Sequence, residues 1–432
     1  MFSQLGLGSA ASASAARLGF TTPTPVQMEA IPLVLRGVDL LARAQTGTGK
    51  TAAFGLPLID RLAKPGTKPS GRKPRALILV PTRELAVQVH DALSTYATST
   101  SLRIAAIYGG VGMSGQTQRL QRGVDIVVAT PGRLIDHLQR RTVDLSAIEV
   151  LTLDEADRML DMGFLPALRR IVAGVPARRQ TLLFSATLSE SIVRLSAEFT
   201  RNAVRIDVSP KQVVATTVTH HVHEVAVERK RDLLTHLLLA HGTGQALVFC
   251  RTKHGANRVG DNLADRGVRT GVIHGNKSQG ARSRTLEDFK AGRVRVLVAT
   301  DIAARGLDIV ELPLVVNFDL PLAAEDYVHR VGRTGRAGQA GRAVSLVAAS
   351  EAGLLREIQR LVTTPLERVA VPTLPEAPGA RPVGRPSAPH GRRADSTVHN
   401  HPPRRHRGQA PGPLGRAAGK PRSFKAGRSS AV

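Results

Sequence analysis

Short apolar runs alternate with helical patterns through the first 208 residues. The runs are rich in β-branched residues and almost uninterrupted by polar ones, and they cover 40–44, 76–80, 125–129, 150–153 and 181–184. Stretches with helical periodicity lie between them, for example at 84–97, 165–172 and 190–199. Strands that alternate with helices predict a parallel sheet, and strands without polar positions predict helices on both faces of that sheet.

A second alternation of the same kind begins after residue 217. Its apolar runs cover 222–227, 246–250, 270–273, 294–299, 314–317 and 343–347. The pattern lapses around 209–217, which indicates a linker. The sequence therefore predicts an α/β protein with two doubly wound parallel-sheet domains, at 1–208 and 218–366, joined by residues 209–217.

The composition changes again near residue 365. Residues 371–432 carry twelve Lys and Arg against two acids, among many Pro, Gly and Ala. Such a segment buries too little apolar surface to offset its ordering entropy, so we predict a disordered basic tail at 367–432. The whole chain has a net charge of +26. This excess predicts a polyanionic partner, nucleic acid first, although a solvated basic surface is the alternative.

Two features bear on where the protein works. No run reaches the ~18 apolar residues of a membrane span, and the Ala/Ser-rich start lacks the marks of a targeting peptide. Cys250 is the only cysteine and lies in the apolar run 246–250, which excludes an internal disulfide and predicts a buried, inert thiol. We therefore expect a cytoplasmic protein that has no membrane partner.

A glycine-rich loop between a predicted strand and a predicted helix carries the first chemistry. Its sequence, A-Q-T-G-T-G-K-T, runs from Ala44 to Thr51. Glycines let successive N–H groups point at phosphate oxygens at a helix N-terminus, while Lys50 reaches the β- and γ-phosphates. The Thr51 hydroxyl is a Mg²⁺ ligand in such loops. The segment predicts a nucleotide-binding loop.

Two adjacent carboxylates, Asp154 and Glu155, follow the apolar run 150–153. Acids at the end of a buried strand need a cation, and the alternative is a helix start with Asp154 as its N-cap. Beside a phosphate loop, the first interpretation gains weight. Asp154 is then placed to hold Mg²⁺ and Glu155 to activate the attacking water.

A cluster of arginines in the second domain supplies the remaining charge. It lies in Y-V-H-R-V-G-R-T-G-R, which runs from Tyr327 to Arg336. Phosphate transfer in such enzymes gains roughly 10³–10⁵ in rate from an arginine supplied from elsewhere. A basic surface turn is the alternative, but three arginines at this spacing favour contacts with a triphosphate.

Together these motifs resemble the DEAD-box family of ATP-dependent RNA helicases over about residues 2–365. The resemblance implies two tandem RecA-like domains, in which Gln27 reads the adenine edge, Phe20 stacks on the ring and Asp308 contacts the ribose. Phe2 stands where the family keeps an upstream aromatic, whereas the Ala/Ser run at 9–16 departs from the expected Leu-rich helix. The implied nucleotide-binding set is Phe20, Gln27, Ala44, Gln45, Thr46, Gly47, Thr48, Gly49, Lys50, Thr51 and Asp308.

The resemblance also implies roles for the other motifs. Glu155, Lys50, Asp154, Arg333 and Arg336 would be catalytic. Asp157, Ser185, Thr187 and His329 would couple hydrolysis to strand separation. The implied RNA contacts are Arg83, Gly110, Thr130, Gly132, Arg133, Arg251, Gln279, Arg282 and Thr300. Arginines suit phosphates and glycines allow close approach, while the low aromatic content of 3% predicts weak sequence preference.

The function predicted from these residues is an ATP-dependent RNA helicase. ATP and Mg²⁺ are the expected cofactors, and RNA is the expected partner, with ribosomal precursors and RNA-decay proteins as candidate partners. RNA-stimulated ATP hydrolysis would drive closure of the two domains, which unwinds short duplexes and remodels RNA. The alternatives are a non-enzymatic RNA-binding scaffold or annealer that acts through the basic tail, and a translocating DNA helicase.

Overall fold

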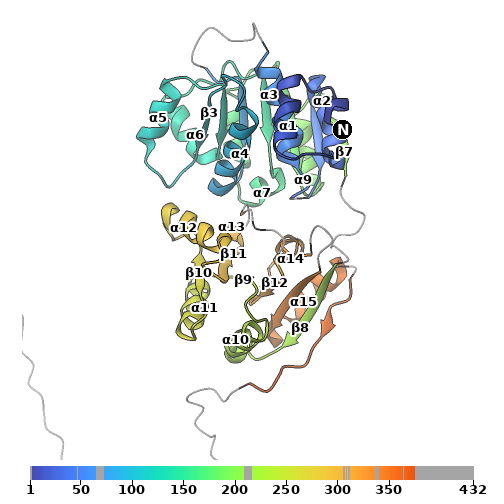
Figure 1. Ribbon diagram of the computed structural model, residues 1–432, viewed down its shortest axis with the longest axis vertical. Coiled ribbons are helices and arrows are strands. Elements are labelled where there is room, and N and C mark those ends of the chain that lie inside the picture. The colour runs from blue at the N-terminus through green and yellow to red at the C-terminus, as the bar shows by residue number, and fades with distance from the viewer. Residues whose placement is uncertain are drawn as a thin grey trace, which may run out of the picture. The chain divides into compact units, whose positions relative to one another are not determined.

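The computed structural model describes residues 2–45, 47–64, 73–208, 217–304, 307, 309, 312–335, 340–362 and 364–374. Within these residues the chain forms two lobes, each built on a parallel β-sheet with helices on both faces (Figure 1). The predicted α/β fold is therefore confirmed. Most of the predicted linker, 209–216, and the chain from 375 onward lie outside the described residues.

The sheet of the N-terminal lobe has seven described strands in the order β3-β4-β2-β5-β6-β1-β7. Strands that neighbour each other in sequence are mostly separated in space, so helices must cross over the sheet between them. The strands are β1 (Leu40–Arg43), β2 (Ala76–Leu79), β3 (Ile104–Ile107), β4 (Ile126–Ala129), β5 (Val150–Leu153), β6 (Gln180–Ser185) and β7 (Val204–Asp207).

Two apolar layers cover this sheet because successive strand residues point to opposite faces. Ile78 of β2 packs into one layer, whereas Leu77 and Leu79 pack into the other. The first layer contains η1 (Phe2–Leu5), α1 (Ser9–Arg17), α2 (Pro25–Leu35), α3 (Lys50–Leu62) and α4 (Arg83–Tyr96). The second contains α5 (Met113–Gln121), α6 (Pro131–Gln139), α7 (Ala156–Asp161), α8 (Leu165–Val172) and α9 (Glu190–Phe199).

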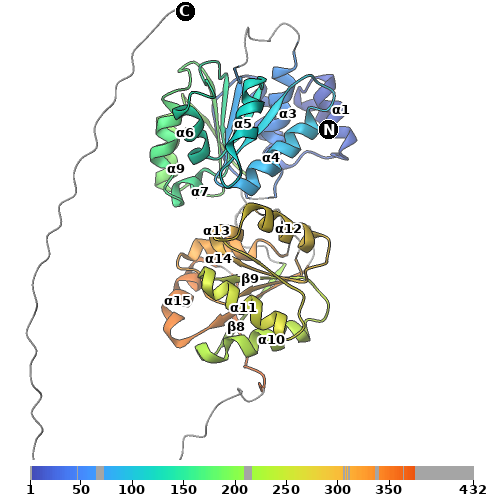
Figure 2. The same ribbon diagram turned by 90° about the vertical axis from the view of Figure 1, so that its left-hand side faces the viewer.

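The C-terminal lobe repeats this architecture with the described strand order β10-β11-β9-β12-β13-β8-β14 (Figure 2). The strands are β8 (Val218–Glu224), β9 (Ala246–Cys250), β10 (Thr270–Ile273), β11 (Val296–Thr300), β12 (Leu314–Asn317), β13 (Gly341–Val347) and β14 (Glu367–Arg368). The helices are η2 (Val227–Arg229), α10 (Lys230–Ala240), α11 (Lys253–Asp265), α12 (Gln279–Lys290), α13 (Asp301–Ala304), α14 (Ala324–Val331), η3 (Ala349–Glu351) and α15 (Ala352–Leu361).

Three strands escaped the sequence prediction, namely β3, β7 and β14. β7 leaves three of its four residues exposed, and β14 consists of two exposed residues. Such edge strands are held by backbone pairing on one side, so they need no apolar run that a sequence pattern would reveal. β14 pairs in parallel with β8 through the register Glu367↔His221 and Arg368↔Val222.

The described contacts of the C-terminal lobe extend past two of the predicted boundaries. Thr217 was expected in the linker, but its carbonyl accepts a hydrogen bond from the Gly341 N–H at 2.9 Å. The tail was expected to begin at 367, yet the described chain continues through Leu374. Val371 and Leu374 pack against one of the lobe's apolar clusters. A few apolar contacts beside an edge strand suffice to hold a segment whose average composition resembles a disordered one.

The Ala/Ser run at the N-terminus forms helix α1. Its small side chains allow close packing, since Ala11, Ser14 and Ala15 are all buried. The Ser14 hydroxyl donates to the carbonyl of Tyr96 at 2.9 Å. Phe2 is 5% exposed despite the missing leucines. Close approach of small residues therefore replaces the bulky apolar face that was expected here.

Two further observations concern the whole described chain. Cys250 is buried as predicted, and burial raises the pKa of its thiol well above the usual range. None of the helices in the described part of the chain has the length and apolar character needed to span a bilayer.

Candidate nucleotide site and nucleic-acid interface

The glycine-rich loop connects the carboxyl end of β1 to the first turn of α3. Gly47 and Gly49 have φ values of 84° and 87°, a left-handed conformation that glycine adopts without a Cβ clash. The Thr48 hydroxyl donates to the carbonyl of Gln45 at 2.7 Å and closes the turn. Ala44 is buried, and its N–H donates to the carbonyl of Ser185 on β6. Thr46 lies outside the described residues.

Lys50 begins α3 and is 6% exposed. Its Nζ lies 3.9 Å from Asp154 Oδ1 and has no hydrogen-bond partner among the described groups. A buried ammonium without such a partner is costly. The helix N-terminus and this ammonium together provide the positive charge that a polyphosphate would neutralise. Thr51, the next residue, is partly buried on the first turn of the same helix.

The two acids follow β5 directly, and Asp154 is 2% exposed. Burial raises the pKa of Asp154 to about 6, although the Lys50 charge opposes this effect. A buried carboxylate with this environment gains from a cation such as Mg²⁺. Glu155 has a φ of 54° and is the N-cap of α7, without a capping side-chain bond. Asp154 is therefore not the helix cap that the alternative interpretation required.

Gln27, which is expected to read adenine, contacts the same loop from α2. Gln27 Oε1 accepts a hydrogen bond from the Thr24 N–H at 2.9 Å, and its Nε2 donates to the Gly49 carbonyl at 3.2 Å. The Phe20 ring centroid lies 6.0 Å from that of Phe2 and 6.4 Å from that of Tyr96. Gln27 thus links the predicted base-reading segment to the phosphate loop, and the aromatic cluster fixes Phe20.

Asp157 ties the acidic motif to the segment that follows β6. Its Oδ2 accepts hydrogen bonds from the N–H groups of Ala186 at 3.0 Å and Thr187 at 3.1 Å, and from the Thr187 hydroxyl at 3.3 Å. Ser185 is fully buried, and its Oγ accepts from the Thr187 N–H. Asp157 therefore connects α7 to residues 185–187 through three hydrogen bonds.

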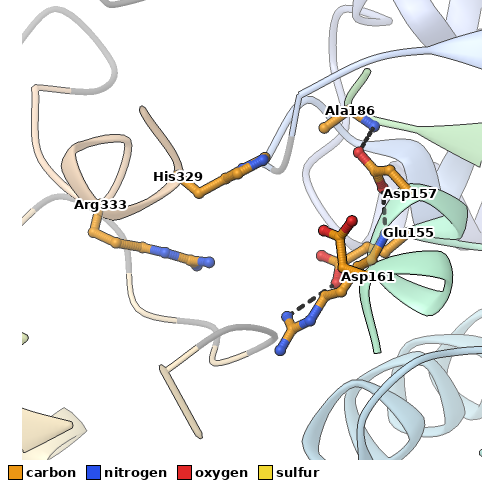
Figure 3. Close-up of a pocket in the computed structure, with 7 residues that line it drawn as sticks. Glu155, Asp157, Asp161, Ala186, His329 and Arg333 are labelled. Atoms are coloured by element: carbon orange, nitrogen blue, oxygen red, sulfur yellow. Dashed lines mark hydrogen bonds and ion pairs between the residues drawn. The ribbon is translucent and has the colours of Figure 1, made fainter. Parts of the chain in front are cut away.

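A small pocket brings the acidic motif together with the arginine motif of the other lobe. Its N-terminal side is lined by Glu155, Asp157, Arg158, Asp161 and Ala186, and its C-terminal side by His329 and Arg333. Figure 3 shows His329 and Arg333 directed toward these carboxylates. Arg333 Nη1 donates to the Leu307 carbonyl at 2.8 Å, which fixes the side chain. Asp308 and Arg336 lie outside the described residues.

Comparisons with known proteins agree with this arrangement. Residues 24–195 match the DEAD/DEAH box helicase family, and residues 229–338 match the helicase conserved C-terminal domain. The chain is 43% identical over 376 residues to the ATP-dependent RNA helicase CshA of Listeria monocytogenes, which covers 87% of this chain and 71% of that protein. The chain belongs to the DEAD-box family of ATP-dependent RNA helicases.

Solved structures of other helicases share the fold. Saccharomyces cerevisiae Dbp5 bound to RNA and ADP BeF3 matches with a TM-score of 0.78 and 31% identity, over 86% of this chain and 95% of that one. Mss116p bound to ssRNA and AMP-PNP matches with a TM-score of 0.76 and 26% identity, over 84% and 77%. The two lobes are thus the tandem RecA-like domains of this helicase family, as predicted.

The predicted RNA-contacting residues of the helicase's first lobe gather at the carboxyl ends of its strands. A Cβ on Gly110 would lie 1.9 Å from Arg83 Nη1, so a larger residue there would displace the Arg83 guanidinium, and the φ of 81° also favours glycine. Thr130 is the N-cap of α6, and Gly132 in its first turn has open space around its Cα. Arg133 donates to the Val111 carbonyl at 3.1 Å and orients the loop before α5.

The corresponding residues of the second lobe make protein contacts that the sequence did not indicate. Gln279 Nε2 donates to Glu84 Oε1 at 3.0 Å, and Arg282 Nη2 lies 2.9 Å from the same oxygen. Glu84 on α4 is therefore a bridge between the lobes. Arg251 donates to Glu351 Oε1 at 2.8 Å. Thr300 is partly buried at the end of β11.

Arg158, directly after the D-E-A-D motif, is a second bridge that sequence reasoning missed. It is 6% exposed, and its guanidinium lies 3.4 Å from Glu155 Oε2 and donates to the Ile302 carbonyl at 3.2 Å. Ile302 belongs to α13 of the other lobe. The helicase thus orients its predicted catalytic Glu155 with an arginine that also contacts the second lobe. An arginine three residues after an acid was the available signal.

Arg330 departs from the expectation that all three arginines of its motif contact a triphosphate, because its guanidinium bonds to groups of its own lobe. It is 2% exposed on α14, and its guanidinium donates to both carboxylate oxygens of Asp301, at 2.6 and 2.7 Å. It also donates to Asn317 Oδ1 and to the Asp319 carbonyl, and it lies 5.0 Å from the Phe249 ring centroid. The network anchors the turn that carries His329 and Arg333. Helical spacing places Arg330 beside the buried residues Tyr327 and Val331. This spacing was the available signal of a buried network, because a buried guanidinium needs partners.

Proposed function

We propose that this helicase hydrolyses ATP only when both lobes contribute to the site, and that closure of the lobes grips RNA. The observation that carries the proposal is the pocket shared by Glu155 and Asp157 of one lobe and His329 and Arg333 of the other. A triphosphate that needs groups from both lobes binds best when they are together. Its binding energy therefore favours closure, and hydrolysis removes that energy.

The phosphate chain would lie on the loop from Ala44 to Thr51. The Nζ of Lys50, which has no hydrogen-bond partner among the described groups, and the N-terminus of α3 support this placement. Asp154 and Thr51 would hold Mg²⁺, which when bound neutralises phosphate charge and polarises the transferring group. Gln27 and Phe20 would bind adenine, and Asp308 the ribose.

Glu155 is proposed as the general base that takes a proton from the attacking water. Arg158 of α7 holds the carboxylate from one side, at 3.4 Å. Arg333, together with Arg336, would stabilise the charge that develops on the transferred phosphate. Asp157 would pass the outcome to Ser185 and Thr187, and His329 would meet it from the other lobe.

RNA would bind across both lobes by its sugar–phosphate backbone. Arg83, Gly110, Thr130, Gly132 and Arg133 form the proposed contact set of the first lobe. Arg251, Gln279, Arg282 and Thr300 form that of the second. Gln279 and Arg282 contact Glu84, so they would join the two halves of the RNA surface as well as bind RNA. Dbp5 and Mss116p, described as bound to RNA and ssRNA, support this assignment.

The expected cellular activity is local unwinding of short duplexes and remodelling of RNA–protein complexes. Duplex stacking costs roughly 1–2 kcal/mol per step by DNA values, so one ATP can support the opening of a few base pairs. We infer a cytoplasmic protein, with ribosomal precursors and RNA-decay proteins as its candidate partners. The paucity of aromatic residues supports weak sequence preference in the core.

The test is Glu155→Gln, which keeps the shape of the side chain and its contact with Arg158. Loss of a general base lowers the hydrolysis rate by roughly 10²–10⁴-fold, while ATP binding persists. The variant should therefore accumulate an ATP-dependent complex with single-stranded RNA. Glu190→Gln, at an exposed glutamate of α9, is the matched control and should behave as the wild type. Unchanged phosphate release by Glu155→Gln refutes the assigned role.

A further inference from the structure

The edge of the N-terminal lobe at which its strands begin carries a hollow that the proposed ATP and RNA motifs do not use. Three segments converge on it: the residues before β2, the end of α5 and the turn after α6. Lys73, Leu120, Gln121, Arg141, Val143 and Asp144 are among its lining residues, and its volume is about 460 Å³. The phosphate loop lies at the opposite edge of the sheet. Strands of four residues, at about 3.3 Å per residue, separate the two edges by roughly 13 Å.

The rim of this hollow is strongly basic. α5 and α6 lie side by side at one end of the sheet (Figures 1 and 2), and each ends in a pair of exposed arginines. Within the described residues none of these four forms an ion pair. They are Arg119, Arg122, Arg140 and Arg141.

The acids of this edge are already engaged. Asp144 pairs with Lys73 at 2.8 Å, and Asp125 accepts a hydrogen bond from the Arg103 backbone N–H at 2.8 Å. Asp136, one turn before Arg140, pairs with Arg133. The Arg103 guanidinium donates to the Arg122 carbonyl and adds a further cation beside α5. The rim therefore holds a net positive charge that no acid in the described part of the chain neutralises.

Arg141 occupies a position at which this chain otherwise uses glycine. Helix α6 ends in a Schellman motif, since the Arg141 N–H donates to the Leu138 carbonyl and the Thr142 N–H to the His137 carbonyl. The φ of Arg141 is 53°, a left-handed value that a side chain disfavours. The equivalent residues after α2, α5, α11 and α12 are Gly37, Gly123, Gly267 and Gly292, all with positive φ. The strained backbone here places a guanidinium at the hollow.

We propose that this edge is a second RNA-binding surface, which holds the phosphodiester backbone of RNA outside the cleft between the lobes. The four exposed guanidinium groups lie on two helix ends, and each can donate to a phosphate in a bidentate manner. Leu120 and Val143 in the hollow offer an apolar floor for one base. The inference rests on the proposed function, because it assigns the same RNA a second point of attachment.

RNA is a better match than an acidic protein segment. Cations here are spaced along helix ends rather than beside an apolar groove that would hold a folded peptide. A surface of this kind needs no particular sequence, which agrees with the few aromatic residues of the chain. RNA long enough to extend from the cleft to this edge would therefore bind more tightly than RNA confined to the cleft.

The experiment uses the full chain with Arg122→Ala, with Arg141→Gly and with both changes. Arg36→Ala is the matched control, because Arg36 also caps a helix before a positive-φ glycine, at the end of α2 on the other face. One RNA probe is the shortest single strand that saturates the ATPase. The second is the same strand with a single-stranded extension. Affinity is measured by fluorescence anisotropy over a range of salt concentrations.

For the extended RNA, each removed contact should lower the slope of log affinity against log salt by about 0.7. Affinity for the short RNA and the ATPase that it stimulates should not change, and Arg36→Ala should match the wild type for both. Arg141→Gly should also raise the melting temperature, since glycine relieves the left-handed backbone, so a loss of binding cannot be ascribed to misfolding.

Equal affinity of the double variant and the wild type for the extended RNA overturns the proposal. So does an equal loss for both RNAs, which places the arginines at the cleft. If a polyglutamate peptide competes with the extended RNA for the wild type but not for the double variant, that result overturns the proposal and assigns this surface to an acidic protein segment instead of RNA. If RNA does not stimulate the ATPase of the wild type, the proposed function is contradicted. The RNA affinities of the wild type and the variants can still be compared in that case.

Discussion

Loss of the Arg330 network should loosen the C-terminal lobe at the turn that carries His329 and Arg333. The perturbation is Arg330→Met, which fills similar space without donors. The change leaves Asp301, Asn317 Oδ1 and the Asp319 carbonyl without their donor. Breaking a buried ion pair costs about 3–5 kcal/mol. Because the Asp301 side chain is 23% exposed, water recovers part of its solvation, and we expect about 3 kcal/mol.

Arg330→Lys separates charge from geometry. It keeps the positive charge but cannot donate to four acceptors through a planar fork. The unsatisfied acceptors should then cost about 1–3 kcal/mol, less than in the Met variant. The pair Arg330→Met with Asp301→Leu removes both charges. The double variant should lose less unfolding free energy than the two single variants together, by at least about 1 kcal/mol. The reason is that neither charge remains buried without its partner.

Hydrogen exchange followed by mass spectrometry measures these costs within one lobe. At about 1.4 kcal/mol per tenfold, a loss of 3 kcal/mol speeds the exchange of amides in α14 and β12 by roughly 150-fold. Amides of α4 in the other lobe are the internal control and should not change. ATPase activity should fall with the exposure of α14, since Arg333 lies one turn beyond Arg330. Wild-type exchange in Arg330→Met, or additive costs in the double variant, would refute the reasoning.

Three further predictions follow from the same structure. Arg333→Ala should reduce turnover by roughly 10³–10⁵-fold while ATP affinity, measured with a fluorescent analogue, falls far less; parallel losses would argue against a role in the transition state. Burial lowers the pKa of His220 to about 4, and the unfolded state takes up this proton near pH 6.5. His220 therefore contributes its full stabilisation above about pH 6.5, and this contribution, about 3 kcal/mol in all, is lost as the pH falls to 4. Urea unfolding of His220→Gln should show a weaker pH dependence through that window. Truncation after residue 374 should leave the unfolding of the C-terminal lobe unchanged but flatten the salt dependence of RNA binding. Truncation after residue 366 should also lower the unfolding free energy by about 2 kcal/mol, because β14 and the packing of Val371 and Leu374 are lost. Equal stabilities of the two truncated chains would contradict this prediction.

The sequence alone determined the features that depend on local spacing. The glycines of the phosphate loop, Lys50 and the acids after β5 all follow apolar strands, and parallel strands bring their carboxyl ends to one edge of a sheet. The order of strands and helices therefore predicted the fold and the place of the nucleotide site. The same local logic located helices α8 and α9 at their observed bounds, 165–172 and 190–199.

Only the tertiary structure decided which charges meet. Glu84 and Gln279 are 195 residues apart, and Arg158 and Ile302 are 144 apart, so no periodicity connects them. The two-residue strand β14 likewise exists because β8 offers an unpaired edge, not because of its own composition. Hydrophobic patterns fix which faces of each element are buried. The partners of a buried charge depend on how those elements pack in three dimensions, and that information lies in the fold rather than in any one segment.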